Sequence, residues 1–212
     1  MSVMENPAAL AAREEDALVP LLAEIRARRE EFAAQRFVPK DFIAQLKKAG
    51  VYRAATPQCF GGSGVSPMGF LQMIERISVA DASVGWVASF GSASVYLAAL
   101  PKETQAKLYA NGPDLTFAGG LFPLQPATQV EGGWMVNGTW KFGSGCKGAD
   151  MLGVGIGAAV PGQAGSKPRT AVLPPEQVEI IDNWDVMGLV GTGSHDLKVS
   201  QQFVPEEWTF IR

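Results

Sequence analysis

The residues whose types and spacing could do chemistry cluster in WKFGSGCKGAD, residues 140–150. A hydroxyl, Ser144, and a thiol, Cys146, lie there among glycines. A serine or cysteine nucleophile needs a base or a cation beside it, and only Lys147 adjoins the thiol. The run GSGCKG lacks the G-x-S-x-G order of a serine hydrolase, and the chain has one histidine. The segment therefore favours a tight turn or a binding surface over a nucleophile.

The residues before Ser144 predict a strand, because turn residues at 131–133 and 137–138 bracket alternating side chains. If residues 139–144 are extended, Trp140, Phe142 and Ser144 face the same way. Two aromatic planes and one hydroxyl on one surface suit an isoalloxazine ring, which offers apolar faces and a ring nitrogen. An ordinary sheet face packed on the core, with Ser144 capping a turn, has the same pattern.

A second glycine-rich run, WDVMGLVGTGSHD, covers residues 184–196. Its G-x-x-G-x-G order is not the Rossmann fingerprint, and no βαβ pattern surrounds it. The glycines with Thr192 and Ser194 would let backbone and hydroxyls approach a ligand closely, although a sharp bend between strands explains them equally. His195, the one histidine, is more typical of a surface or structural residue than of a base.

The segment DASVGWVASFGSASVY, residues 81–96, is rich in small residues and carries Trp86 and Phe90. It fits either the wall of an aromatic-sized pocket or a close helix–helix packing face. The two cysteines, Cys59 and Cys146, are expected to be reduced. Two cysteines and one histidine are too few for a dedicated zinc site, so no metal site is predicted.

The elements that must position these residues change character along the chain. Apolar periodicity and Pro and Gly boundaries predict helices over residues 8–35, 39–49, 67–80, 83–99 and from Pro101 to Tyr109. After NGPD, residues 111–114, short β-rich runs separated by turn signals predict about seven strands. We therefore expect an α+β fold: a helical domain, residues 1–113, then an antiparallel β-barrel or sandwich-like middle domain, residues 114–212.

Composition limits the classes of partner. The 212 residues are 47% hydrophobic and 18% charged, which is typical of a globular chain. A net charge of −3 gives no basic footprint for nucleic acid. No apolar run reaches membrane-spanning length, and the N-terminus lacks the basic flank and apolar core of a secretory signal. We expect a cytoplasmic protein that binds neither nucleic acid nor membrane.

Five stretches in this order resemble the acyl-CoA dehydrogenase superfamily, and more closely the flavin-dependent monooxygenases that share its fold. The resemblance covers essentially the whole chain, and its most specific parts are the W-x-F-x-S-G and W-D-V-x-G-L-x-G-T-G-S runs. The stretches are LKKAGVYRAATPQCFGG, ISVADASVGWVASFGSASVYLAALP, FAGGLFP, VEGGWMVNGTWKFGSGCKGADML and WDVMGLVGTGSHDLKV with FVPEEW. The family fold has three domains, and we expect this chain to correspond to the first two, without the C-terminal helical bundle.

The resemblance implies the oxygenase component of a two-component aromatic hydroxylase. Such enzymes receive reduced FMN from a separate flavin reductase, react it with molecular oxygen to a C4a-hydroperoxyflavin and hydroxylate an aromatic or heteroaromatic substrate. It also implies a homo-oligomer, a homotetramer in the family. Two alternatives remain: an acyl-CoA dehydrogenase, with FAD as cofactor and an acyl thioester as substrate, or a truncated, non-catalytic remnant that binds partner chains.

The resemblance assigns roles to particular residues. Ser144, the catalytic candidate, matches the hydroxyl near flavin N5, where it would slow the loss of peroxide. The other expected flavin contacts are Gly120, Leu121, Phe122, Trp140, Phe142, Gly145, Thr192 and Ser194, and the expected substrate pocket contains Trp86, Phe90 and Cys146. The chain departs from the family at Val190, where arginine is usual, and at residues 91–94, where the hydroxylases often carry a histidine.

Overall fold

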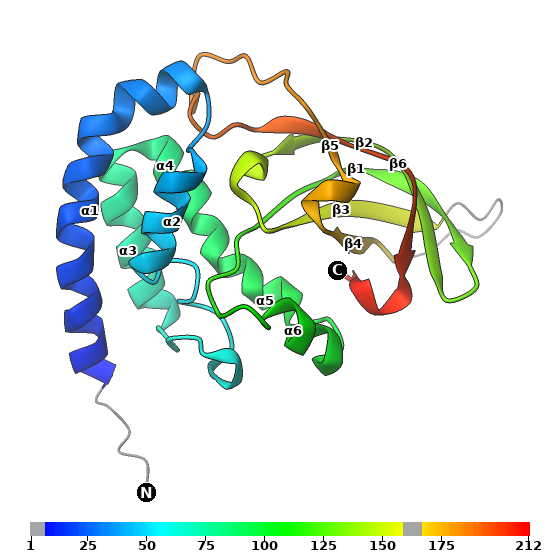
Figure 1. Cartoon of the computed structure of the whole chain (residues 1–212), viewed down its shortest axis with the longest axis horizontal. Helices are drawn as coiled ribbons and strands as arrows, with labels where there is room; N and C mark the ends of the chain where they lie inside the picture. Colours follow the sequence, from blue (N-terminus) through cyan, green and yellow to red (C-terminus); the bar gives the residue numbers. More distant parts are fainter. Residues whose placement is uncertain (1–6, 159–166) are drawn as a thin grey trace, which may run out of the picture.

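The computed structural model describes the backbone of residues 7–158 and 167–212, and the side chains of 18–157 and 167–212. Helices occupy the first half of the described chain, and strands occupy the second half on the other side of the molecule (Figure 1). The helical elements are α1 (Pro7–Gln35), α2 (Lys40–Lys48), η1 (Gln58–Phe60), α3 (Pro67–Ala80), α4 (Ala82–Ser89), η2 (Phe90–Ala93), α5 (Ser94–Leu97) and α6 (Lys102–Leu108). This order confirms the predicted α+β class.

Local chemistry explains where α3 and α4 begin. The Ser66 hydroxyl accepts the Gly69 N–H at 3.1 Å, and Pro67 opens α3. Asp81 ends α3 and starts α4, where its carboxylate accepts the Val84 N–H at 2.9 Å. The buried side chains of α1 to α4 then form one core cluster, which includes Phe32, Phe42 and Ile77.

The helix predicted over residues 83–99 is wrong in one respect, because α4 ends at Ser89 and a 3-10 turn separates it from α5. The hydroxyls of Ser89, Ser92 and Ser94 each donate to the carbonyl three residues earlier. Gly91 also lies against the Val51 carbonyl, 2.5 Å from where a Cβ would stand. Serine back-bonding and this close packing favour the tighter turn.

The strands form one seven-stranded sheet in the order β5-β6-β2-β1-β3-β4-β7. Neighbouring strands are antiparallel except β1 and β3, which are parallel. The predicted antiparallel β domain is therefore confirmed except at this pair, because β2 leaves β1 as a hairpin and the chain then crosses back to β1's other edge. The strands are β1 (Phe117–Val130), β2 (Gly133–Gly143), β3 (Met151–Ala158), β4 (Arg169–Leu173), β5 (Glu179–Ile181), β6 (His195–Pro205) and β7 (Thr209–Ile211).

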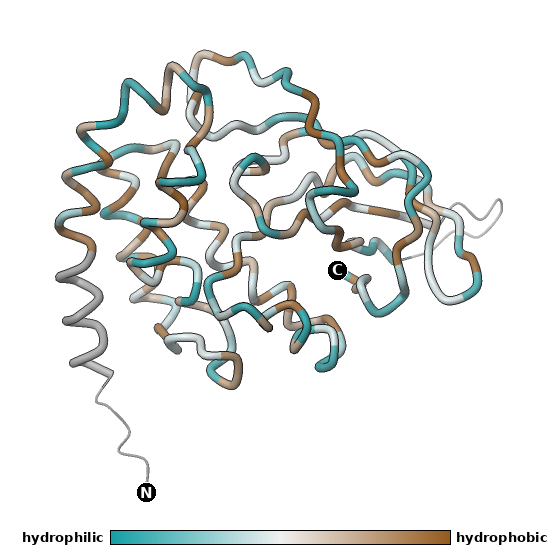
Figure 2. Tube along the Cα trace, in the orientation of Figure 1, coloured by the Kyte–Doolittle hydropathy of each residue, from teal (hydrophilic) through white to brown (hydrophobic). Residues whose placement is uncertain are grey.

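Two further core clusters hold the sheet. One lies within the β half and is built around Trp140, Leu152 and Leu197. The other joins the two halves, because Leu97, Leu108 and Tyr109 pack with Phe117 and Phe210. Figure 2 shows hydrophobic and hydrophilic residues interspersed along the described chain, and none of its described helices is long and apolar enough to cross a membrane.

The loop between β5 and β6, residues 182–194, reaches from the sheet to the junction of α1 and α2 (Figure 1). Phe37, in this junction, forms an isolated antiparallel bridge with Thr192. Arg36 is ion-paired with Asp185, and its guanidinium donates to the Trp184 carbonyl at 3.0 Å. The loop that carries Thr192 and Ser194 is thus fixed against the helical half.

Candidate functional site

Ser144 lies in a turn immediately after β2. The Gly145 N–H donates to the Thr192 carbonyl at 2.8 Å, and Gly145 has a positive φ of 74°. A side chain would be strained at that φ. The following turn rests on α2, because the Lys47 ammonium pairs with Asp150 at 2.6 Å. The turn is therefore held from both sides, by the loop 182–194 and by α2.

Three buried hydroxyls form a chain at this turn. Ser144 Oγ lies 2.7 Å from Ser194 Oγ, and Ser194 Oγ lies 2.7 Å from Thr192 Oγ1. Thr192 Oγ1 donates to the Leu189 carbonyl at 2.9 Å. All three side chains are at most 6% exposed. The structure thus brings Ser144 together with two residues that lie about fifty positions later in the sequence.

Phe142 and Trp140 do not share a face with Ser144, so the predicted alternation is wrong. Trp140 is fully buried in the β core, and its indole N–H donates to the Gly155 carbonyl at 2.7 Å. The β2–β6 register shifts between Trp140 and Gly143, and Phe142 has a positive φ of 61°. This irregularity turns the Phe142 ring outward, where it is 64% exposed.

The ring of Phe142 meets the loop 182–194 edge-on. Its centroid lies 6.2 Å from that of Trp184, at an interplanar angle of 85°. The Trp184 indole N–H donates to the Val190 carbonyl at 3.1 Å, which fixes the indole on its own loop. The Trp184 indole is therefore already fixed in place beside the Phe142 ring, while most of that ring stays accessible.

Gly120, Leu121 and Phe122 lie where β1 leaves its sheet partners. The β1–β3 register shifts between Gly120 and Gln125, and the β1–β2 ladder begins only at Ala127. Backbone groups of residues 121–124 thus stand outside both ladders. Gly120 packs against β2, since a Cβ there would lie 2.7 Å from the Trp140 Cβ. Phe122 is 66% exposed, with the Arg212 guanidinium 4.8 Å from its ring centroid.

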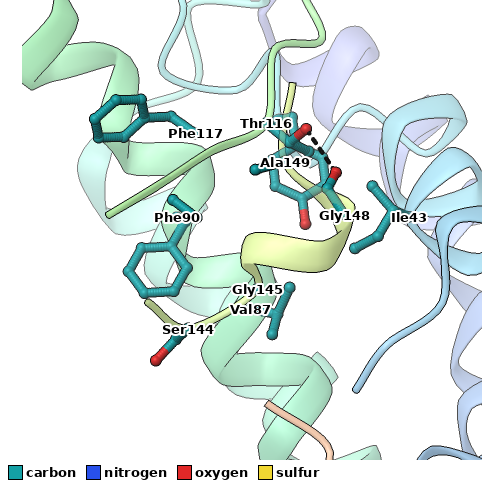
Figure 3. A pocket seen from close by; sticks show the side chains of 11 residues that line it. Ile43, Val87, Phe90, Thr116, Phe117, Ser144, Gly145, Gly148 and Ala149 are labelled. Atoms are coloured by element: carbon teal, nitrogen blue, oxygen red, sulfur yellow. Dashed lines mark hydrogen bonds between the residues drawn. The ribbon is translucent and has the colours of Figure 1, made fainter. Parts of the chain in front are cut away.

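A small pocket lies between the helical half and the turn that holds Ser144, and its volume of about 10 Å³ has room for about one water molecule. Phe90, Phe117 and Ser144 are among its lining residues (Figure 3). In Figure 3 the Ser144 oxygen points away from the other labelled side chains. This oxygen lies 2.7 Å from Ser194 Oγ. Trp86, half exposed, meets Phe90 edge-on at 5.9 Å between centroids. Phe90 therefore lines this pocket and Trp86 does not, and the substrate pocket itself stays a prediction.

Cys146 does not line this pocket, so its predicted place there is wrong. Its side chain is 1% exposed and belongs to the β core, and the thiol donates to the Gly193 carbonyl at 3.5 Å. Burial raises the pKa of the Cys146 thiol to about 11. A buried thiol that stays protonated is a packing residue, as the absence of a neighbouring base indicated.

Two polar side chains at the site, Tyr52 and His195, are more deeply buried than the sequence indicated. The Tyr52 hydroxyl belongs to the pocket lining and has no hydrogen-bond partner among the described residues, and burial raises the pKa of this phenol. His195 is 1% exposed, and its Nδ1 accepts the Trp184 N–H at 3.1 Å. Burial lowers the pKa of His195, so it is a neutral imidazole with its proton on Nε2. Its structural role was expected, but its burial was not.

The charges nearest the turn pair with one another. Lys147 pairs with Asp182 at 3.1 Å, which holds the pKa of that carboxyl below its usual range. Among the described residues no group of three or more His, Cys, Asp or Glu side chains could hold a metal ion. The polar chemistry at the turn is therefore that of neutral hydroxyls and backbone groups.

The arrangement fits a flat ring system with one polar edge. Phe142 offers an accessible apolar surface, Ser144 an oxygen with lone pairs, and residues 121–124 backbone groups outside the sheet ladders. A tricyclic heteroaromatic ring with ring nitrogens and a carbonyl-bearing edge has matching chemistry.

Comparison with known proteins supplies the relatives of this chain. Residues 15–112 match the family model described as acyl-CoA dehydrogenase, N-terminal domain. The indole-3-acetate monooxygenase of Pseudomonas putida is 56% identical over 187 residues, 88% of this chain and 48% of the relative. A protein of the same name from Acinetobacter baumannii is 50% identical over 212 residues, 100% of this chain and 54% of the relative.

A more distant relative and a solved structure agree. The oxygenase component of the FADH(2)-dependent resorcinol hydroxylase of a Rhizobium species is 38% identical over 177 residues, 81% of this chain and 42% of the relative. The crystal structure of the 3-HSA hydroxylase from Rhodococcus sp. RHA1 matches with a TM-score of 0.88 at 30% identity, over 93% of this chain and 52% of that chain. The chain spans about half the length of the curated relatives it matches.

Proposed function

Because the chain belongs to the flavin-dependent monooxygenases that share the acyl-CoA dehydrogenase fold, we propose that it carries the N-terminal and middle parts of a reduced-flavin-dependent aromatic oxygenase. The observation that carries this proposal is the turn after β2, which joins an exposed aromatic ring, Phe142, to a buried hydroxyl chain at Ser144. The same turn borders a pocket that contains Phe90.

When bound, reduced flavin supplies the electrons that activate molecular oxygen. We place the ring of the flavin against Phe142, with N5 beside Ser144 and the pyrimidine edge beside the backbone of Leu121 and Phe122, where the Leu121 carbonyl also accepts from the Arg212 guanidinium at 3.4 Å. Gly145, Thr192 and Ser194 hold Ser144 in place. Trp140 is left out of the contact set, since its indole is fully buried.

In this proposal Ser144 keeps a hydrogen bond at N5, so that the proton at that nitrogen is not lost. By holding that proton, Ser144 would slow the release of hydrogen peroxide and leave the activated oxygen for the substrate. The apolar wall of Phe90 and Phe117 excludes water from the same space. No side chain of the described pocket is placed as a base, which agrees with Gly91 to Ser94 standing where related hydroxylases often have histidine.

For the substrate we propose an indole-type heteroaromatic acid. The support is the 56% and 50% identity to the two indole-3-acetate monooxygenases and the aromatic lining of the pocket. Ligand pockets usually measure about 300–1,000 Å³, so this cavity of about 10 Å³ is at most the inner wall of the proposed site. The Tyr52 hydroxyl offers this wall a polar atom without a partner among the described residues.

The alternative of an acyl-CoA dehydrogenase with an acyl-thioester substrate is not favoured. The family model over residues 15–112 is named for those dehydrogenases, but the relatives that extend over the β half are monooxygenases. We propose reduced FMN from a separate reductase as the cofactor, with FAD to be tested in parallel, since the resorcinol hydroxylase is named for FADH(2). Homo-oligomeric assembly and a cytoplasmic location stay predictions.

The test is an anaerobic titration of this chain, and of any longer form of the protein that contains it, with reduced FMN and reduced FAD. Phe142→Ala should weaken binding about tenfold, since an aromatic contact contributes about 0.5–1.5 kcal/mol beyond area burial. Phe203→Ala, which removes another partly exposed ring of the same sheet, is the matched control. Equal losses in both variants would contradict the placement of the ring.

Turnover gives the second readout. With oxygen and indole-3-acetate, Ser144→Ala should release more hydrogen peroxide per molecule of substrate oxidised than the unchanged protein does. An unchanged ratio of peroxide to product would remove Ser144 from its proposed role, and a protein that binds no flavin in either form would remove the function itself.

A further inference from the structure

The direction of each hydrogen bond in the hydroxyl chain follows from counting protons. The Leu189 carbonyl can only accept, so the one hydroxyl proton of Thr192 points to it. Thr192 Oγ1 must then accept from Ser194, which spends the one hydroxyl proton of Ser194. Ser194 Oγ must in turn accept from Ser144. The Ser144 hydroxyl is left with its proton engaged and with both lone pairs lacking a donor among the described residues.

This count makes Ser144 an acceptor toward any further partner. A donor such as a ring N–H meets a free lone pair and disturbs nothing. A ring nitrogen with a lone pair needs the Ser144 proton, and the two bonds between the hydroxyls then persist only if all three hydroxyls reverse. Reversal ends the Thr192 Oγ1–H bond to the Leu189 carbonyl, which keeps only the Thr192 backbone N–H at 3.1 Å.

We propose that Thr192 and Ser194 are positioning residues that hold Ser144 as an acceptor and so make the site prefer reduced over oxidised flavin. The inference rests on the proposed function, in which flavin N5 lies beside Ser144. N5 carries a hydrogen in reduced flavin and a bare lone pair in oxidised flavin. The Leu189 carbonyl, which we call the anchor, fixes the direction of the hydrogen bonds because it can only accept. Leu189 also has a positive φ of 53°, which turns the loop at this residue.

The preference has a definite size. Reversal forfeits one neutral hydrogen bond, and such a bond changes an equilibrium by roughly two- to tenfold. Tighter binding of the reduced form raises the midpoint potential of bound flavin, by about 30 mV per tenfold for a two-electron couple. Losing the anchor should therefore lower the potential of bound flavin by about 10–30 mV.

The experiment measures the dissociation constants of reduced and oxidised FMN, and the midpoint potential of bound FMN, in four proteins: unchanged, Thr192→Val, Thr192→Ser and Thr170→Val. Thr192→Val should bind oxidised FMN relatively more tightly and lower the potential. Thr192→Ser keeps the hydroxyl and should behave as the unchanged protein. Thr170 is equally buried, and its hydroxyl has no hydrogen-bond partner among the described residues, so Thr170→Val controls for the loss of a buried hydroxyl.

Each outcome decides between two separate ideas. A potential that falls in Thr192→Val alone supports the inference. The same ratio of dissociation constants in all four proteins overturns it and leaves the proposed function standing. Failure of both flavin forms to bind, in this chain and in any longer form that contains it, overturns the proposed function and the inference with it. If Thr192→Val disrupts the fold of the loop, Ser194→Ala is the second variant. It frees the Ser144 proton directly and should lower the potential by the amount expected for Thr192→Val.

Discussion

At Gly155 of β3, a single added methyl group should push the backbone of β1 away from β3. A Cβ on Gly155 would lie 2.1 Å from the Leu121 carbonyl oxygen and 2.8 Å from the carbonyl carbon. Both are backbone atoms, so no rotamer relieves the overlap, and the 121–124 segment must move outward. The indole N–H of Trp140 also donates to the Gly155 carbonyl, which ties β2 to the same point.

The expected cost of Gly155→Ala follows from these contacts. Overpacking with backbone movement costs about 1–3 kcal/mol, and the lower entropy of the unfolded alanine chain returns about 0.4–1 kcal/mol. The net loss is about 1–2 kcal/mol, which for a chain of this size lowers Tm by about 2–8 °C. Because the 121–124 backbone moves, reduced FMN should also bind more weakly.

Gly157, two residues along the same strand, is the matched control. A Cβ there would meet no heavy atom of the described residues within 4 Å, so Gly157→Ala should be neutral or stabilise by up to about 1 kcal/mol. Urea unfolding of the two variants, beside the unchanged protein, measures the difference. Equal changes of the same sign would refute the reasoning, because they would mean that the Leu121 carbonyl does not limit the space above Gly155.

Two further predictions concern groups with shifted pKa values. Burial lowers the pKa of folded His195 below its ordinary 6.5, so the unfolded chain takes up the proton first and stability is lost as pH falls below about 6.5. His195→Asn keeps an acceptor for the Trp184 N–H but has no group that titrates in this range. The urea midpoint of this variant should therefore fall less than that of the unchanged protein between about pH 7 and pH 5. Because burial raises the pKa of Cys146 to about 11, only the exposed Cys59 should react with a thiol reagent in the folded protein. A second thiol that reacts without denaturant would contradict the latter.

The sequence predicted the parts of the fold that depend on local pattern. Apolar periodicity and capping residues located α2 and α3, and turn residues between β-rich runs located the hairpin of β1 and β2. The parallel pairing of β1 with β3 was not predictable, because it depends on which edge of β1 the chain returns to. The break of the helix at Phe90 depends on the Val51 carbonyl packed against Gly91, a contact between residues that are distant in sequence.

The site was predicted in part for the same reason. Ser144, Thr192 and Ser194 were named separately, and the structure adds that they bond to one another and end on the Leu189 carbonyl. Tyr52 gave no signal, because an aromatic residue in a Gly- and Pro-rich connector is usual. No local pattern reports that its hydroxyl is buried without a partner among the described residues.

The failed alternation at Phe142 is itself informative about the site. A left-handed backbone costs a residue with a side chain about 1–2 kcal/mol, and a phenylalanine ring left 64% exposed forgoes burial energy as well. Packing in the β core does not offset either cost, because Trp140 already fills that core. Glycine would adopt the same φ without strain. Residues in strained backbone conformations, and residues that break the local rules of folding, cluster at functional sites. The irregularity that made the predicted alternation wrong is therefore also the reason to place the ligand against Phe142.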